Sequence, residues 1–183
     1  KIFELEQEEV KNSLKEVTNL EETSKKIALA AYRYGMLRID PKQDIVFDIN
    51  DVTRFEGNTG PYLMYTYARA MSIVEKSGIE ASSLESNIEL FENIKMEEKE
   101  ISLLRFMCTF SETVSLSADT MSPHLIANFL YDFAQKFNSF YSEVPVLNAK
   151  EDLRFFRLVL VCCSAQVIKN GLKLLGINVV EKM

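Results

Sequence analysis

The sequence has no tryptophan, a single histidine and only three cysteines among its 183 residues. Because no Cys-x-x-Cys pair occurs and His124 stands alone, we expect neither a metal site nor a disulfide framework. Cys108, Cys162 and Cys163 are predicted to be small core residues of a reduced, cytosolic protein. His124 lies where a helix is expected to begin, so a capping or surface role is favoured over catalysis.

Familiar catalytic patterns are missing as well. The sequence contains no Rossmann glycine fingerprint, no P-loop and no Ser/His/Asp or Cys/His set. Glu97, Glu98 and Glu100 are close in sequence, but an acid–base pair needs a cleft and a partner, so we interpret these carboxylates as a solvated face. No catalytic residue is therefore predicted in this chain.

Membrane and targeting signals are also lacking. No apolar run has the length of a membrane span and no signal peptide begins at Lys1, which predicts a cytoplasmic protein without a membrane partner. A first residue other than methionine indicates a fragment of a longer protein. The formal net charge of −6 disfavours a general nucleic-acid binder, although it leaves room for a local site that works through shape and stacking.

What is present is a regular helical pattern. The length and the 47% hydrophobic content suit one globular core, and the apolar spacing predicts an all-α bundle of about five helices. Ser122 is the expected N-cap of the fourth helix, with Pro123 at its first position. The predicted helices cover residues 21–37, 61–76, 97–116, 123–141 and 151–175.

The segments between these helices carry weaker signals. Residues 43–49 are rich in β-branched and aromatic side chains, which predicts a short extended segment or strand, with a turn of helix following at 51–54. Residues 81–94 are expected to form an irregular or short helical connection. Residues 1–20 are predicted to be a solvated helix or a connection to a missing upstream domain, which leaves residues 21–183 as the helical domain.

The most informative stretch is Phe-Glu-Gly-Asn-Thr-Gly-Pro-Tyr-Leu-Met-Tyr-Thr-Tyr-Ala-Arg, residues 55–69. Glycine tolerates positive φ, Asn and Thr favour turns and caps, and proline suits the first position of a helix. This stretch therefore predicts a compact turn that launches a helix, which Gly78 ends. The turn-forming residues are Gly57, Asn58, Thr59, Gly60 and Pro61.

At about 100° per residue, the launched helix has two different faces. One is an ordinary core stripe of Leu63, Tyr67, Ala70, Met71 and Val74. The other combines rings and cations: Tyr62, Tyr65, Arg69, Ser72 and Lys76. Rings of this kind stack on unpaired bases while Arg and Lys hold phosphates, although half-buried tyrosines beside a solvated arginine are the commoner arrangement at helical spacing.

Residues 55–69 resemble the signature of the C-terminal, DALR-type anticodon-binding domain of arginyl-tRNA synthetases, in which an acidic, glycine-rich loop precedes Pro-Tyr-Leu-x-Tyr-x-x-x-Arg. Residues 122–132, 137–141 and 144–147 resemble the same domain. Residues 171–177 with the ending Val-Glu-Lys-Met look like the natural C-terminus of that family. The resemblance covers most of residues 25–183.

The resemblance implies an all-α anticodon-binding domain of a class Ia synthetase, whose partner is the anticodon region of tRNA(Arg). A mobile loop from Arg54 to Thr59 would touch the RNA, and the last residue would pack beside the anticodon even though a chain end is usually disordered. We expect the tail that carries this residue to be ordered without RNA. The implied tRNA-binding residues are Tyr62, Tyr65, Arg69, Tyr141, Met183, Asn58 and Thr59.

The catalytic motifs of class I synthetases, His-Ile-Gly-His and Lys-Met-Ser-Lys-Ser, are absent from the chain. The resemblance therefore implies that an upstream catalytic domain joins arginine to tRNA with ATP and Mg²⁺, and that this fragment is inactive alone and holds no cofactor. Two departures from the family pattern are Pro145, where some relatives have a large aromatic side chain, and Gly35-Met36-Leu37 in place of Ala-Asp-Leu. The first departure puts one base contact in doubt.

Two other functions remain open at this stage. One is the anticodon domain of a related class I synthetase such as the cysteinyl enzyme, which the stretch from Gly57 to Arg69 and the Glu-Lys-Met ending disfavour. The other is a helical protein-interaction module, which the net charge of −6 would suit better than it suits an RNA-binding domain. Binding to a tRNA pool, compared with a protein pull-down, would distinguish these classes.

Overall fold

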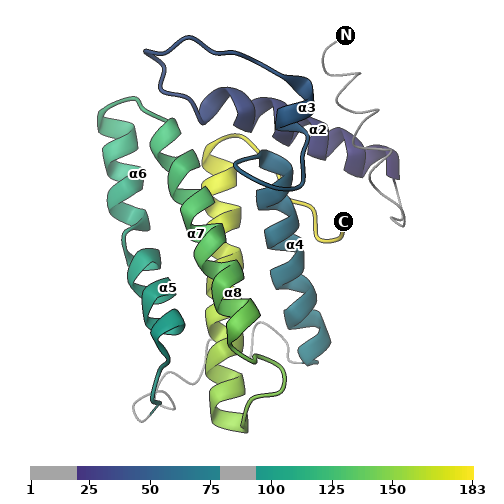
Figure 1. Cartoon of the computed structure of the whole chain (residues 1–183), viewed down its shortest axis with the longest axis vertical. Coiled ribbons are helices and arrows are strands. Elements are labelled where there is room, and N and C mark those ends of the chain that lie inside the picture. The colour runs from purple at the N-terminus through teal and green to yellow at the C-terminus, as the bar shows by residue number, and fades with distance from the viewer. Residues whose placement is uncertain (1–19, 79–93) are drawn as a thin grey trace.

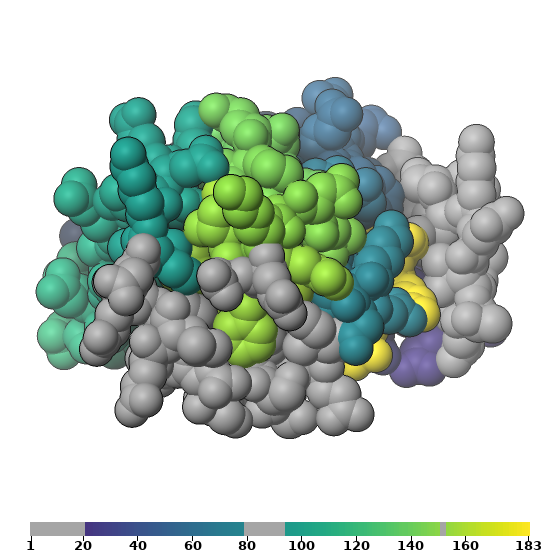
Figure 2. All heavy atoms as spheres, turned by 90° about the horizontal axis from the view of Figure 1, so that it is seen from below, coloured from purple at the N-terminus to yellow at the C-terminus, as the bar shows by residue number. Residues whose placement is uncertain are grey.

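The computed structural model describes residues 20–78 and 94–183, so the predictions for residues 1–19 and 79–93 lie outside the described residues. The helices are α2 (Leu20–Leu37), α3 (Ile49–Val52), α4 (Gly60–Ser77), α5 (Glu98–Cys108), α6 (Phe110–Asp119), α7 (His124–Glu143) and α8 (Glu151–Leu174). Helices α2 and α3 lie across one end of a bundle formed by the others (Figure 1). Viewed along the bundle, the start of α8 (yellow-green) lies in the middle, with α4 (blue-teal) on one side and α5 and α6 (teal) on the other (Figure 2).

The all-α prediction is confirmed, and the core lies where the apolar stripes place it. Helix α7 contributes four phenylalanines that lie on one buried face: Phe129, Phe133, Phe137 and Phe140. Phe106 of α5 stacks on Phe129 with ring centroids 4.9 Å apart, which joins α5 to α7. Helix α4 packs against α8, α2 and α7, so three neighbouring helices hold it in place.

The predicted helix over residues 97–116 is wrong in one respect, because the structure divides it into α5 and α6 at Thr109. The Thr109 hydroxyl donates a hydrogen bond to the carbonyl of Phe106 at 2.8 Å, and its own N–H bonds to the same carbonyl at 3.1 Å. A threonine that competes for a preceding carbonyl in this way interrupts the regular helical pattern. The described residues therefore contain six helices of ten residues or more and the short α3.

Two smaller expectations about local structure also change. Ser122 does not cap α7, because its hydroxyl donates to the carbonyl of Thr120 at 3.1 Å and the helix begins one residue later than expected, with Pro123 as N-cap. Of the two alternatives predicted for residues 43–49, the strand is wrong, because residues 44–48 are without regular secondary structure. Helix α3 starts at Ile49, ahead of the predicted turn of helix. Asp48 caps α3 by accepting from the Asn50 N–H at 2.9 Å.

Of the three carboxylates interpreted as a solvated face, Glu97 and Glu98 are exposed as predicted, and the prediction is wrong for Glu100. Glu100 is fully buried and accepts from the Arg157 Nε at 2.6 Å, while Glu97 accepts from the Arg157 Nη2 at 2.6 Å. Glu97 and Glu100 also form the capping box of α5. A buried guanidinium needs such partners. The sequence around Glu100 does not indicate that Arg157 packs against it.

The prediction that the cysteines are core residues is wrong for two of the three. Cys108, the last residue of α5, and Cys163 are exposed, while Cys162 is half-buried and packs against the core. The fully buried face of α8 passes through Val161 and Ala165. Burial, with a smaller contribution from Cys163, raises the pKa of the Cys162 thiol to about 11. All three thiols are free in the described residues.

The expectation that no segment could span a membrane needs one qualification. Residues 153–174 of α8 are long and apolar enough to do so by length and composition, with a mean hydropathy of 1.4. However, 56% of that stretch is buried inside the bundle, against α4 and α7. The core helix of a soluble protein passes the same test, so this helix is weak evidence for a membrane.

Candidate nucleic-acid interface

Helix α4 extends the predicted helix over residues 61–76 by one residue at each end, and its cap and its terminating glycine are those predicted. Thr59 is its N-cap, since the Thr59 hydroxyl accepts from the Tyr62 N–H at 3.2 Å and donates to the Arg54 carbonyl at 2.6 Å. Gly78 ends the helix with φ of 69°, a left-handed conformation that favours glycine. At Gly60 a Cβ atom would collide with the backbone carbonyl of Ala30, so only glycine lets α4 approach α2 this closely.

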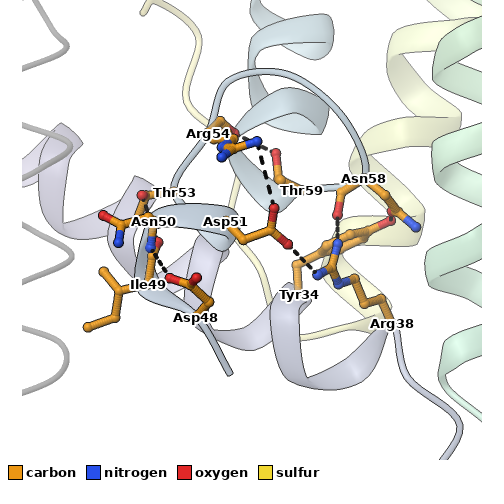
Figure 3. A network of polar contacts seen from close by, with 10 residues as sticks. All are labelled: Tyr34, Arg38, Asp48, Ile49, Asn50, Asp51, Thr53, Arg54, Asn58 and Thr59. Atoms are coloured by element: carbon orange, nitrogen blue, oxygen red, sulfur yellow. Dashed lines mark hydrogen bonds and ion pairs between the residues drawn. The ribbon is translucent and has the colours of Figure 1, made fainter. Parts of the chain in front are cut away.

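The turn before α4 is held by a polar network (Figure 3). The hydroxyl of Tyr34, a fully buried residue of α2, lies 2.6 Å from the Asn58 Oδ1 and 2.8 Å from the carbonyl of Ala127. Arg38 donates to the backbone carbonyl of Asn58 and to Asp51, the latter at 3.2 Å. Burial raises the pKa of the Tyr34 hydroxyl, so it stays neutral and able to serve this network.

A pocket of about 730 Å³ opens on the exposed face of α4, and we call it the α4 pocket. Its walls come from α4, from the end of α7 and from the C-terminal tail, residues 177–183. Tyr65 and Tyr141 are 39% and 37% exposed, so each offers part of a ring to solvent. The lining residues that matter here are Tyr65, Arg69, Lys76, Asn138, Tyr141 and Met183.

Arg69 is the centre of the polar contacts in this pocket. Its guanidinium carbon lies 4.8 Å from the centre of the Tyr65 ring, and its Nη2 donates to the Tyr65 hydroxyl at 3.1 Å. Its Nη1 donates to the Asn138 Oδ1 at 3.1 Å, and the Asn138 Nδ2 donates in turn to the Tyr62 hydroxyl at 2.9 Å. These contacts fix the guanidinium beside the ring of Tyr65.

The tail reaches the same pocket through a defined turn. Gly176 adopts φ of 72° after α8, and the Ile177 N–H bonds to the Leu172 carbonyl at 2.8 Å, as in a Schellman motif. Ile177 and Val180 are then buried against the core, and Lys182 pairs with Glu75 of α4 at 3.0 Å. Two apolar anchors and one ion pair therefore carry Met183 into the lining of the α4 pocket.

The charge of the pocket is mixed despite the net negative charge of the chain. Arg69, Lys76 and Lys182 supply positive charge, while Glu75 and Glu181 supply negative charge. Glu75 is engaged by Lys182, which reduces its repulsion of an anion. The Glu181 carboxylate adds to the effect of burial in raising the pKa of Tyr67, which lies behind the pocket. Such a site suits a ligand that offers both a flat ring and a phosphate.

The structure brings together four of the seven residues predicted to bind tRNA: Tyr65, Arg69, Tyr141 and Met183. Tyr62 is half-buried behind them, with its ring 5.9 Å from that of Tyr131, and it contacts the pocket through Asn138. Asn58 and Thr59 do not line the pocket, because their polar atoms hold the turn before α4. The contribution of each residue to RNA binding stays a prediction.

Asn138 is a pocket residue that contacts Arg69 directly and that the sequence interpretation did not select. It lies on α7 one turn before Tyr141, and it connects Arg69 of α4 with Tyr62. The available signal was its place in the Phe-Asn-Ser-Phe-Tyr stretch of residues 137–141, where a polar residue lies between buried phenylalanines. A half-buried amide in that position needs partners, and the only way to identify them is to know which helix packs opposite.

The fold identifies the class of domain. All of the chain superposes on the solved arginyl-tRNA synthetase of Thermus thermophilus with a TM-score of 0.89 and 32% identity, covering 32% of that chain. The arginyl-tRNA synthetase of Plasmodium falciparum has the same fold over 100% of this chain, at 24% identity and a TM-score of 0.87. The chain therefore has the all-α fold of one domain of these enzymes.

A family model described as the DALR anticodon binding domain matches residues 63–183, and this chain belongs to that family. The arginine–tRNA ligase of Clostridium botulinum is 41% identical over 169 residues, which are 92% of this chain and 29% of the relative. The arginine–tRNA ligase of Pyrococcus furiosus is 38% identical over 166 residues, or 89% of this chain and 26% of the relative. The chain thus spans less than a third of the length of these relatives.

Proposed function

We propose that this chain recognises the anticodon region of tRNA(Arg) as the anticodon-binding part of an arginine–tRNA ligase. The observation that carries the proposal is the α4 pocket, in which Tyr65, Arg69, Tyr141 and Met183 meet from three separate elements. Membership of the DALR anticodon binding domain family supports the RNA ligand, and relatives named arginine–tRNA ligase support arginine rather than cysteine as the cognate amino acid.

In this proposal the pocket receives bases that the anticodon loop leaves unstacked. The partly exposed rings of Tyr65 and Tyr141 provide stacking surfaces, and the thioether of Met183 packs on a base or a ring. Within the described residues Arg69 donates two side-chain hydrogen bonds, so further N–H groups of its guanidinium can bind a phosphate or a base edge. Stacking is tolerant of sequence, so the remaining donors of Arg69, which Asn138 holds in position, would supply discrimination.

The remaining predicted residues act through geometry. Tyr62 supports Asn138, while Asn58 and Thr59 set the shape of the turn that launches α4. A direct contact between this turn and RNA is part of the proposal for its exposed residues, Arg54 and Glu56, rather than for the buried Thr59 hydroxyl. The turn would then determine where α4, and with it Tyr65, meets the anticodon.

The chemistry belongs to the rest of the longer protein. The chain aligns with 29% of the Clostridium botulinum relative, so the remainder would hold arginine, ATP and Mg²⁺ and perform aminoacylation in the cytoplasm. We propose no cofactor and no catalytic residue in this chain, whose contribution to the reaction is to bind and orient tRNA. Isolated, it should bind tRNA without charging it.

The test is a comparison of tRNAs. The affinity of the 183-residue chain for purified tRNA(Arg) would be measured beside tRNA(Cys) and a tRNA(Arg) transcript with an altered anticodon. The proposal expects preferential binding of unaltered tRNA(Arg) and a loss on changing the anticodon by about 1–3 kcal/mol per critical base. Equal affinity for all three RNAs, or capture of a protein with no binding of tRNA, would contradict it.

A further inference from the structure

Among the described residues, helix α2 contributes none to the lining of the α4 pocket, yet it contacts the elements that form the pocket. Two consecutive side chains make these contacts. The Tyr34 hydroxyl is within hydrogen-bond distance of Asn58, in the turn before α4, and of the Ala127 carbonyl of α7. The neighbouring Arg33 donates from Nη1 to the backbone carbonyl of Gly176, in the turn that leads from α8 into the tail. Helix α2 therefore connects the origins of all three walls.

The Arg33 contact falls on the residue at which the chain leaves α8. Gly176 has φ of 72°, and a Cβ added to it would lie 3.3 Å from the Arg33 Nη1 and 3.9 Å from the Arg33 Cζ. The guanidinium thus lies against the Cα of this turn as well as its carbonyl. A carbonyl beyond the last turn of a helix has no helical N–H to bond with, so a charged donor from another element is a strong partner for it.

The rest of the tail has few directional contacts. Within the described chain, residues 178–183 make no backbone hydrogen bond. Ile177 and Val180 are buried, but apolar burial is non-directional, and the exposed pair of Lys182 with Glu75 is weak. Apart from the bond of the Ile177 N–H that closes α8, the directional contact at the base of the tail is the one from Arg33.

Arg33 differs in position from the cations of the α4 pocket. Arg69, Lys76 and Lys182 line that pocket and can reach a ligand there. Arg33 is half-buried, is not part of the lining, and directs its Nη1 at a backbone carbonyl of the same chain. Its geometry therefore suits holding the tail rather than binding a phosphate.

We propose that Arg33 is a positioning residue of the RNA site, which fixes the path of the tail through the Gly176 carbonyl and thereby holds Met183 in the α4 pocket. Arg33 touches no ligand in this assignment. The inference rests on the proposed function for what Met183 contacts, but the placement of Met183 is a property of the chain without RNA.

The first test observes that placement in the 183-residue chain, which forms its own core, without RNA. Labelling the methionine methyl groups with ¹³C gives seven NMR signals, and Met183→Leu identifies the signal of the tail. In Arg33→Gln the amide is too short to reach the Gly176 carbonyl. The Met183 signal should then shift toward that of Met121, which is 84% exposed, while the signal of the fully buried Met64 should not move.

The second test measures the affinity of the same variants for tRNA(Arg). Arg33→Gln should weaken binding by about two- to tenfold, and by no more than removal of Lys182 and Met183 does, because it acts through the tail. In a chain that already lacks residues 182–183, Arg33→Gln should have no further effect. The slope of log affinity against log salt should stay unchanged, since Arg33 contacts no phosphate.

Arg105→Gln is the matched control, because it removes the same charged group from an exposed position of α5 outside the α4 pocket. It should change neither the Met183 signal nor tRNA binding. An unmoved Met183 signal in Arg33→Gln would overturn the proposal, and so would a Met64 signal that moves with it, because the substitution would then disturb the whole core. A reduced salt slope would make Arg33 a phosphate contact, and equal losses in the intact and shortened chains would make it a general support of the fold. Either result would also overturn the proposal.

The two tests separate this inference from the proposed function. If the Met183 signal moves as expected in Arg33→Gln but the unsubstituted chain does not bind tRNA, the proposed function fails and positioning of the tail by Arg33 stands. If the chain binds tRNA(Arg) and the Met183 signal does not move, positioning by Arg33 alone fails.

Discussion

Tyr65 and Tyr32 expose nearly the same fraction of their surface, 39% and 41%, yet they lie among different neighbours. Tyr65 is beside the Arg69 guanidinium, in a pocket that also holds Lys76 and Lys182. Tyr32 contacts Phe47, in a patch flanked by exposed carboxylates. The comparison shows that the exposure of an aromatic ring does not identify its ligand, because the charges and donors around the ring decide whether a base or a protein surface fits.

Gly60, where α4 packs closely on α2, should be the position at which a substitution destabilises the chain most. Gly60→Ala would place a methyl group against the backbone carbonyl of Ala30, which cannot move without shifting α2 from α4. We expect a loss in the free energy of unfolding of about 3 kcal/mol. Urea unfolding of the chain measures this loss.

Gly57→Ala is the control for that substitution. Gly57 has φ of 79° but no atom within 4 Å of an added Cβ, so the cost is conformational only, about 1 kcal/mol. Equal destabilisation by the two substitutions would show that the close approach of α2 and α4 is unimportant.

Arg69→Gln tests whether the positive charge beside Tyr65 contributes to tRNA binding. Loss of the guanidinium removes a charge-assisted bond to RNA, which should weaken tRNA binding by about 1.5–3 kcal/mol and reduce the slope of log affinity against log salt by about 1. Arg105→Gln, at an exposed position of α5, should change neither quantity. An unchanged salt slope for Arg69→Gln would remove this residue from the RNA interface.

Asn138→Ala tests whether the pocket depends on positioning. Without the amide, Arg69 and Tyr62 each lose a partner, and we expect tRNA binding to weaken by about 1 kcal/mol. Because Asn138 acts through Arg69, the loss should be smaller when Arg69→Gln is already present. Strictly additive losses would contradict a positioning role, and Gln135→Ala on the same helix should have no effect.

Removal of Lys182 and Met183 should have the smallest effect. The Lys182–Glu75 pair is 73% and 63% exposed, so the free energy of unfolding should fall by less than about 1 kcal/mol. Loss of the Met183 contact should weaken tRNA binding by about 0.3–1.5 kcal/mol. Unfolding curves and tRNA titrations on the same preparation separate the two quantities, and unchanged tRNA binding would remove the tail from the site.

Local signals predicted much of this structure. Thr59, Pro61 and Gly78 determine the ends of α4, because caps and positive φ depend on neighbours in the chain. The phenylalanines of α7 likewise reveal its buried face through their spacing. Both features depend on positions within a few residues of one another.

The errors arise where a distant partner decides the outcome. Glu100 is buried because Arg157, 57 residues later, lies against it. The Asn138 contacts likewise join residues 69 and 76 positions apart. The exposure of Cys163 was not predicted because the periodicity of α8 left its buried face ambiguous, and the packing of α4 and α7 against α8 decides which face is buried.

The most direct test of the account is tRNA(Arg) binding by Tyr65→Ala and Tyr32→Ala, two substitutions matched in residue type and exposure. With both folds verified by circular dichroism, Tyr65→Ala should weaken binding by about 1–3 kcal/mol, the usual contribution of a base stacked on a ring. Tyr141→Ala should resemble Tyr65→Ala, and Tyr32→Ala should stay within about 0.5 kcal/mol of the unsubstituted chain. Equal losses at Tyr65 and Tyr32, or no loss at Tyr65, would contradict the assignment of the α4 pocket as the RNA-binding surface.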